Sequence, residues 1–135
     1  MIINNKEILQ SYILTTAKYD YSVYEKRILY RMLEIFQQLT NGAKLNEKIF
    51  IQTDLYDVKI FTIPLAQFLV NEEDRNHAFL KKALISLSKK TFEYEDDKVW
   101  EQISIISEPV IKKYDKSVRF RINPRVVEAF LDFSK

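Results

Sequence analysis

The chain has 135 residues and a formal net charge of +2, and 47% of its residues are hydrophobic and 13% aromatic. This composition predicts one packed domain spanning residues 1–135 and argues against a disordered or repetitive chain. The chain has no cysteine and no apolar run near the roughly 20 residues of a membrane span. These absences exclude disulfide and thiolate chemistry, and they favour a cytoplasmic protein with no membrane partner.

The first half of the chain predicts one well-defined helix. Residues Asn4–Thr16 indicate an extended or partly helical lead-in. The segment Ser22–Glu25 has the spacing of a capping box, and Asn41-Gly42 can end a helix with a left-handed residue. Between these signals, apolar residues recur at helical spacing: Ile28, Leu29, Met32, Leu33, Phe36 and Leu39.

The middle of the chain predicts a strand pair followed by a helix pair. Lys48–Thr53 and Asp57–Thr62 are rich in Ile, Phe and Val, so we expect two strands joined through Asp54–Tyr56. Pro64–Val70 predicts a short helix, because proline suits a first helical turn. An amphipathic helix over Arg75–Lys90 would complete a helix-turn-helix pair. Its apolar stripe comprises Phe79, Leu80, Ala83, Leu84 and Leu87.

The last third of the chain predicts antiparallel strands and a closing helix. The expected strands are Thr91–Glu95, Val99–Ser107 and Val110–Arg121. Pro109 marks a break or an edge, because proline cannot donate to a central ladder. In the alternating run Val118–Ile122 the apolar side chains face one way and both arginines the other. Asn123-Pro124 begins a helix. Three strand aromatics are expected in the core: Tyr94, Trp100 and Phe120.

Charge is distributed unevenly along the chain. Residues 75–125 contain twelve Lys and Arg against seven Asp and Glu, whereas residues 44–74 contain three against six. Together with the predicted elements, this asymmetry indicates an α+β domain of the winged-helix type, with a basic face that could meet a polyanion. The side chains expected to contact DNA are, on the helix, Arg75, Lys81, Lys82, Ser86, Lys89 and Lys90 and, on the β-ribbon, Lys112, Lys113, Lys116, Arg119 and Arg121.

The expected contacts are with phosphates and not with base edges. Lysine binds phosphate well but reads bases poorly, because it lacks the bidentate donor geometry of arginine. An ordinary solvated helix face is the alternative interpretation of the helical lysines. A lysine-rich hairpin is also a common means of keeping an exposed strand edge from aggregating.

The sequence offers little that could carry out covalent chemistry. His77 is the only histidine and Gly42 the only glycine, so neither a histidine metal site nor a glycine-rich phosphate loop can be built. The densest acidic group comprises Glu93, Glu95, Asp96 and Asp97. Strand alternation would place the two glutamates on a solvent face and the two aspartates in a turn. We therefore predict no catalytic residue, no metal ligand and no cofactor.

The order of segments resembles the N-terminal winged-helix domain of the plasmid replication initiator (Rep-type) family. The matching stretches are NNKEILQSYILTTAKYDYSVYEKRILYRMLEIF, AFLKKALISLSKKTFEY and VWEQISIISEPVIKKYDKSVRFRINPRVVEAFLDFSK. The resemblance covers almost the full length as a pattern of apolar and polar positions, without a single diagnostic short motif.

The resemblance implies a function as well as a fold. Such initiators carry two tandem winged-helix domains, bind repeated origin sites as monomers and often repress their own promoter as dimers. They help to melt an AT-rich segment and recruit host replication proteins, and they are not hydrolases. The first domain contributes dimerisation and backbone contacts, while the second supplies most base reading. Residues 1–135 would then be the first domain, with double-stranded origin DNA, a second copy and host replication proteins as partners.

Other functions remain open on the sequence alone. The domain could be mainly a dimerisation module that pairs through an apolar edge comprising Ile49, Phe50, Ile51, Ile60 and Phe61. It could be a winged-helix transcriptional regulator. A weaker alternative is a metal nuclease that uses Glu93, Glu95 and Asp97.

Overall fold

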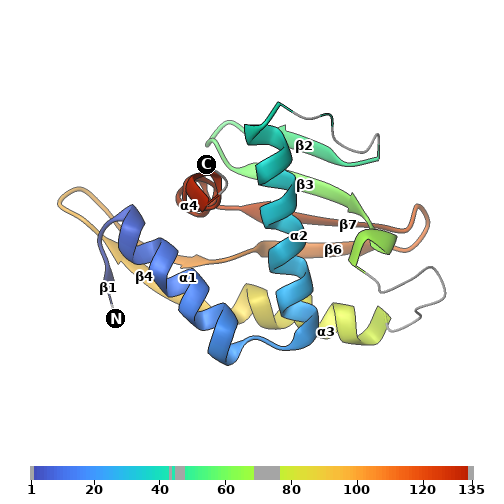
Figure 1. The fold of residues 1–135 in the computed structure, drawn as a ribbon, viewed down its shortest axis with the longest axis horizontal. Helices are drawn as coiled ribbons and strands as arrows, with labels where there is room; N and C mark the ends of the chain where they lie inside the picture. The colour runs from blue at the N-terminus through green and yellow to red at the C-terminus, as the bar shows by residue number, and fades with distance from the viewer. Residues whose placement is uncertain (1, 43, 45–47, 69–76, 134–135) are drawn as a thin grey trace.

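Four α-helices, one 3-10 helix and seven strands make up the described part of the chain (Figure 1). The structure, a computed structural model, describes residues 2–42, 44, 48–68 and 77–133. The helices are α1 (Lys6–Asp20), α2 (Val23–Thr40), the 3-10 helix η1 (Leu65–Phe68), α3 (His77–Lys89) and α4 (Pro124–Phe133). The strands are β1 (Ile2–Ile3), β2 (Phe50–Thr53), β3 (Lys59–Pro64), β4 (Thr91–Glu95), β5 (Trp100–Ser104), β6 (Ser107–Lys112) and β7 (Ser117–Ile122). The predicted α+β class is confirmed.

The strands form two sheets. The larger sheet is antiparallel throughout and has the order β2-β3-β7-β6, so β2 and β6 are its edges. The smaller sheet has the order β1-β4-β5, and β1 runs parallel to β4. The expected antiparallel sheet is thus accompanied by a mixed one. The parallel pairing was not predicted, because β1 is only two residues long and too short for a recognisable pattern.

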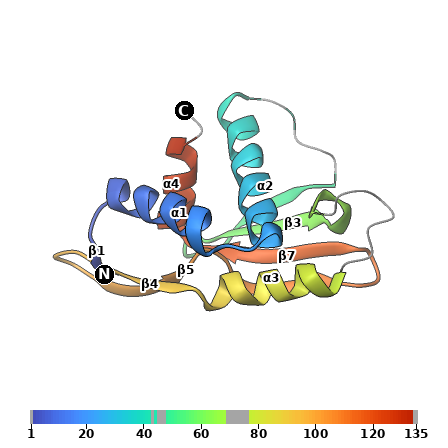
Figure 2. The ribbon, with the colours of Figure 1, turned by 60° about the horizontal axis from the view of Figure 1, so that its bottom comes forward.

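The helices cover one side of the sheets, except for α3. Figure 2 shows α1, α2 and α4 above the strands, while α3 runs beside β6 at the edge of the larger sheet. Buried phenylalanines join the layers: Phe36 of α2 stacks on Phe130 of α4 at 5.5 Å and meets Phe61 of β3 edge-on at 5.4 Å. Phe61 in turn stacks on Phe120 of β7 at 6.0 Å. The core position expected for Phe120 is confirmed.

The N-terminal segment is more regular than expected. Where an extended or partly helical lead-in was expected over Asn4–Thr16, a continuous helix runs from Lys6 to Asp20. Asn5 caps it, because its side-chain oxygen accepts a hydrogen bond from the Ile8 amide at 2.9 Å. The Lys6 ammonium then bonds to Asp132 of α4 at 2.5 Å, which raises the pKa of Lys6 and ties α1 to α4.

The predicted boundaries of α2 are confirmed. Ser22 and Glu25 form the capping box, with the Glu25 amide donating to the Ser22 hydroxyl oxygen at 3.3 Å. The helix ends at Asn41-Gly42, where Gly42 has φ +70°. One member of the apolar stripe was placed wrongly: Leu39 is exposed in the last turn, while Ile35 is buried instead.

Near Pro64 and near Pro109 the element boundaries differ from the prediction. Pro64 ends β3 instead of opening a helix, and η1 covers Leu65–Phe68. Val70 lies outside the described residues. The break between β5 and β6 falls earlier than Pro109, at Ile105-Ile106, which are buried. Pro109 was expected to mark a break or an edge, and the edge is confirmed, because Pro109 lies inside the edge strand β6. The proline is tolerated there because β6 is an edge strand with a bulge between Ser107 and Val110.

The end of α3 is anchored by a buried ion pair. The Lys90 ammonium lies 2.6 Å from Glu25 Oε2, 2.9 Å from the Asp20 carbonyl oxygen and 4.8 Å from the centre of the Tyr21 ring. Glu25 is only 4% exposed, and burial also raises the pKa of Tyr21. The contact joins the end of α3 to the α1–α2 junction.

A second polar contact closes the turn between β2 and β3. These two strands were predicted to pair through this turn. Asp54 Oδ1 accepts hydrogen bonds from the Tyr56 and Val58 amides at 2.8 and 3.0 Å. Its Oδ2 lies 3.0 Å from Nη1 of Arg121 on β7. The bond from the Val58 amide is the main cause that holds the pKa of Asp54 below its usual value, and Arg121 adds to it.

We predict that Lys90→Met destabilises the domain by about 2–3 kcal/mol, because it leaves the buried Glu25 carboxylate without its counter-ion. Urea unfolding followed by circular dichroism measures the change. The double variant Glu25→Gln, Lys90→Met should recover most of this stability, since neither buried group is then charged. A single variant as stable as the wild type would show that the pair has no structural role.

We also predict a stability decrease at acid pH that depends on Asp54. Because its folded-state pKa is lowered, the ionised carboxylate stabilises the fold above the unfolded-state pKa of about 4 and this contribution disappears as pH falls through the folded-state pKa. Asp54→Asn should therefore be less stable than the wild type near neutral pH, with the difference shrinking in acid. Urea titrations across this range test it, with the exposed turn variant Asp97→Asn as control. A difference independent of pH would contradict the linkage.

Candidate nucleic-acid interface

The burial pattern of α3 determines which of its cations reach solvent. Leu80, Ala83, Leu84 and Leu87 are buried as predicted, which leaves three exposed lysines on the rest of the helix surface: Lys81, Lys82 and Lys89. The helix begins at His77 in the described residues; Arg75 lies outside them. Ser86 is half-buried.

Phe79 was wrongly placed in the apolar stripe. It is 56% exposed and stacks on Tyr24 of α2, with ring centroids 5.8 Å apart and planes 9° apart. The guanidinium of Arg27 lies 4.6 Å from the Tyr24 ring on α2. Phe79 therefore packs sideways against α2 at the surface, which its spacing alone did not distinguish from a core position.

The β6–β7 hairpin presents a second group of lysines. Lys112, Lys113 and Lys116 are exposed at its turn. Lys116 has φ +54°, and its carbonyl oxygen accepts a hydrogen bond from the Leu65 amide at 2.8 Å. The turn is therefore held against η1. Arg119 is exposed on β7, opposite Thr62 in the strand register.

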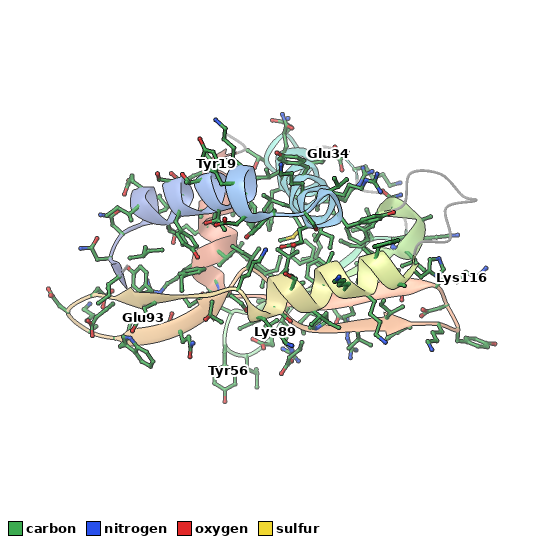
Figure 3. The ribbon with its side chains drawn as sticks, turned by 90° about the horizontal axis from the view of Figure 1, so that it is seen from below. Tyr19, Glu34, Tyr56, Lys89, Glu93 and Lys116 are labelled. Carbon is green, nitrogen blue, oxygen red and sulfur yellow. The ribbon has the colours of Figure 1, made fainter. Side chains whose placement is uncertain are left out.

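A cavity brings the two lysine groups together. It has a volume of about 700 Å³ and lies between α3 and the β6–β7 hairpin. Lys81 of α3 and Lys113 and Lys116 of the hairpin line it, and its walls include Leu84, Ile85 and Ile111. Figure 3 shows Lys116 and Lys89 on the side of the molecule where α3 lies. Residues more than thirty positions apart in the sequence thus share one basic surface.

Two predicted contact residues form ion pairs with acids of this chain. The Lys90 ammonium is bound to Glu25 and to the Asp20 carbonyl oxygen. The Arg121 guanidinium lies 3.0 Å from Asp54 and 2.6 Å from Glu108. Because the charges of these two cations are compensated locally, neither belongs to the basic surface around the cavity.

In the β4–β5 hairpin, Asp96 stabilises the turn, and the two glutamates lie on the solvent face. Asp96 Oδ1 accepts the Lys98 and Val99 amides at 2.8 and 3.0 Å, which lowers the pKa of Asp96, and Arg125 adds to the shift. Glu93 and Glu95 face solvent as expected. In the part of the chain that the structure describes, no three carboxylates or histidines come together as metal ligands would. His77 is exposed and lines the cavity.

Two aromatic residues of this hairpin were expected in the core. The prediction is confirmed for Tyr94 and wrong for Trp100. Tyr94 is buried, and the Arg125 guanidinium lies 3.7 Å from the centre of its ring. Trp100 is 55% exposed, and its indole N–H donates to Glu93 Oε1 at 3.0 Å. Alternation along a strand places side chains on two faces without revealing which face is covered, and β5 directs Trp100 outward.

None of the helices in the described residues has the length and apolar character that a bilayer crossing requires.

Comparisons with known proteins agree with this architecture. A comparison with curated proteins found no match. Among solved structures, the WH1 domain of MSBI1.176, a replication protein isolated from a multiple sclerosis patient, superposes with a TM-score of 0.59. The two chains are 18% identical, and the match covers 96% of this chain and 95% of the other. This likeness confirms the predicted winged-helix fold.

The sequence itself matches a family model described as "Initiator Replication protein, WH1" over residues 7–135. The match spans nearly the whole chain and agrees with the resemblance stated from the residues. It assigns the domain a role in the initiation of plasmid replication. The chain therefore belongs to the WH1 family of initiator replication proteins.

Proposed function

We propose that this domain binds double-stranded DNA at a plasmid origin, mainly through phosphates. The observation that supports the proposal is the cavity whose rim joins Lys81 of α3 to Lys113 and Lys116 of the β6–β7 hairpin. Four further cations are exposed on the same two elements and are included in the proposed surface: Lys82, Lys89, Lys112 and Arg119. Cations on a helix and a neighbouring hairpin can follow the backbone of a duplex, where most protein–DNA hydrogen bonds are made.

The chemistry of the surface favours backbone contact over base reading. Six of its seven cations are lysines, which bind phosphate as point charges. Arg119, the only arginine in the set, projects from β7 and not from α3. The domain would act by binding, without a catalytic step. Origin repeats and host replication proteins as partners, which the family resemblance implies, belong to the same proposal.

The salt dependence of binding tests this proposal. Removing one lysine–phosphate interaction should reduce the slope of log K against log salt by about 0.9, so Lys81→Glu, Lys113→Glu, Lys116→Glu together should flatten it by about 2–3. Fluorescence anisotropy with a labelled duplex between about 50 and 200 mM salt measures the slope.

The matched control is Lys18→Glu, an exposed lysine of α1. Tyr19, its neighbour, is labelled in Figure 3 on the side of the molecule away from α3. The control should leave the slope unchanged. Equal effects of the control and the triple variant, or binding that is insensitive to salt, would rule out the lysine surface as the DNA site.

We propose a second role in dimerisation, through β2, an edge strand of the larger sheet in the part of the chain that the structure describes. Phe50 is 58% exposed at the start of this edge strand, and the turn that follows its other end exposes Leu55 and Tyr56. Of the apolar set predicted for this edge, Phe61 is fully buried, and Ile49 and Ile51 pack partly against the core. The contact would thus use Phe50 and the side of β2 that pairs with no other strand of the described residues, as isologous edge pairing does.

Analytical ultracentrifugation tests the dimer. In about 0.5 M salt, where exposed charge pairs are screened, the wild type should approach twice the monomer mass with rising concentration. Phe50→Lys should remain monomeric, because a lysine would place two like charges at the edge. A wild type that stays monomeric at the highest concentration would exclude this role.

A further inference from the structure

The β4–β5 hairpin carries an exposed aromatic side chain among acids. Trp100 pairs directly across the strands with Glu95, and its indole N–H donates to Glu93. Because Phe92 and Tyr94 are buried on the opposite face, these three side chains share the solvent face of the hairpin. Asp97 in the turn adds a third exposed carboxylate, while Lys98 is the only cation of the turn.

The cavity beside α3 has the complementary character. Its walls are apolar, from Leu84, Ile85 and Ile111, and Lys81, Lys113 and Lys116 line it. Asp115 is the single acid of that hairpin turn. A ligand that fits this cavity would have an apolar body large enough to cover the walls and negative charges near the lysines. Nucleic acid phosphates supply the charges but not the apolar body.

The two features lie at opposite ends of the molecule. Figure 1 shows the β4–β5 hairpin at one end of the long axis and the β6–β7 hairpin at the other. Glu93 and Lys116 mark these two ends in Figure 3. A hairpin cannot therefore reach the cavity of its own chain.

We propose that Trp100 and its acidic neighbours dock into the lysine-lined cavity of a second copy of this chain. The indole covers the apolar walls of the cavity. The carboxylates approach its lysines; they belong to Glu93, Glu95 and Asp97. Such a contact is heterologous: each copy bound through its hairpin still offers an empty cavity, and each copy bound through its cavity still offers a free hairpin. The contact therefore builds open chains of molecules, in contrast to the closed dimer of an isologous edge.

The rim lysines also belong to the proposed DNA surface, so a docked hairpin and a duplex would exclude each other. That consequence rests on the proposed function. The self-association does not, because it is measured in the absence of DNA, and failure of DNA binding would leave it untouched.

Sedimentation tests the contact. It is measured in about 50 mM salt, because exposed charges attract over a longer distance at low salt. The mass of the wild type should rise with concentration beyond that of a dimer, and Phe50→Lys, which blocks the β2 edge, should still associate. Trp100→Ala should weaken the association at least about tenfold, as truncation of an aromatic anchor does. The pair Lys113→Glu, Lys116→Glu should abolish it.

Mixing the two variants gives the decisive measurement, which is made in the Phe50→Lys background. Trp100→Ala retains an intact cavity, and Lys113→Glu, Lys116→Glu retains an intact hairpin. At a concentration where about half of the parent protein associates, each should be largely monomeric alone, and together they should form a 1:1 complex that grows no further. Formation of this complex also shows that both variants are folded. A mixture that stays monomeric while the parent protein associates, or a parent protein that is monomeric throughout, overturns the proposal.

Discussion

The orientation of α3 depends on the ion pair between Glu25 and Lys90. Glu25 serves two purposes with its two oxygens: one accepts the Ser22 amide in the capping box of α2, and the other accepts the Lys90 ammonium at 2.6 Å. A carboxylate that is 4% exposed has given up most of its hydration, so it is stable only while both donors stay in place. The end of α3 is therefore fixed to the start of α2. The burial of Leu80, Leu84 and Leu87 then determines the rotation of the helix.

The net charge of the chain says little about its surface, because the cations divide into two kinds. Lys90, Arg121 and Arg125 have acids within hydrogen-bonding distance and connect elements far apart in the sequence. The exposed lysines of α3 and of the β6–β7 turn have no such partner among the described residues. A net charge of +2 thus coexists with a cavity lined by three lysines. Position in the fold, and not composition, produces the basic surface.

The features of the fold that could be predicted are those with a local sequence signal. The limits of α2 and the face of β7 followed from the sequence, because a capping box, Asn41-Gly42 and strict alternation are local signals. The helix α1 was expected only as one alternative, a partly helical lead-in, because its buried residues Leu9, Ile13 and Ala17 form only a sparse stripe. Phe79 and Trp100 are exposed because of how distant elements pack around them, which their own strand or helix pattern does not reveal. No local pattern indicated that Lys90 pairs with Glu25, 65 positions away.

A lysine-lined apolar cavity distinguishes its ligands by chemistry. Phosphates would meet Lys81, Lys113 and Lys116 and leave the walls formed by Leu84, Ile85 and Ile111 in water, so their binding would depend on released counterions and hence on salt. An indole flanked by carboxylates would bury the walls as well, and removing apolar area from water gives a negative heat-capacity change. Calorimetry can therefore separate the two ligands although they share the same lysines. The apolar walls of the cavity contribute nothing to holding a duplex. Their presence beside the lysines is the reason to expect a protein ligand at this surface.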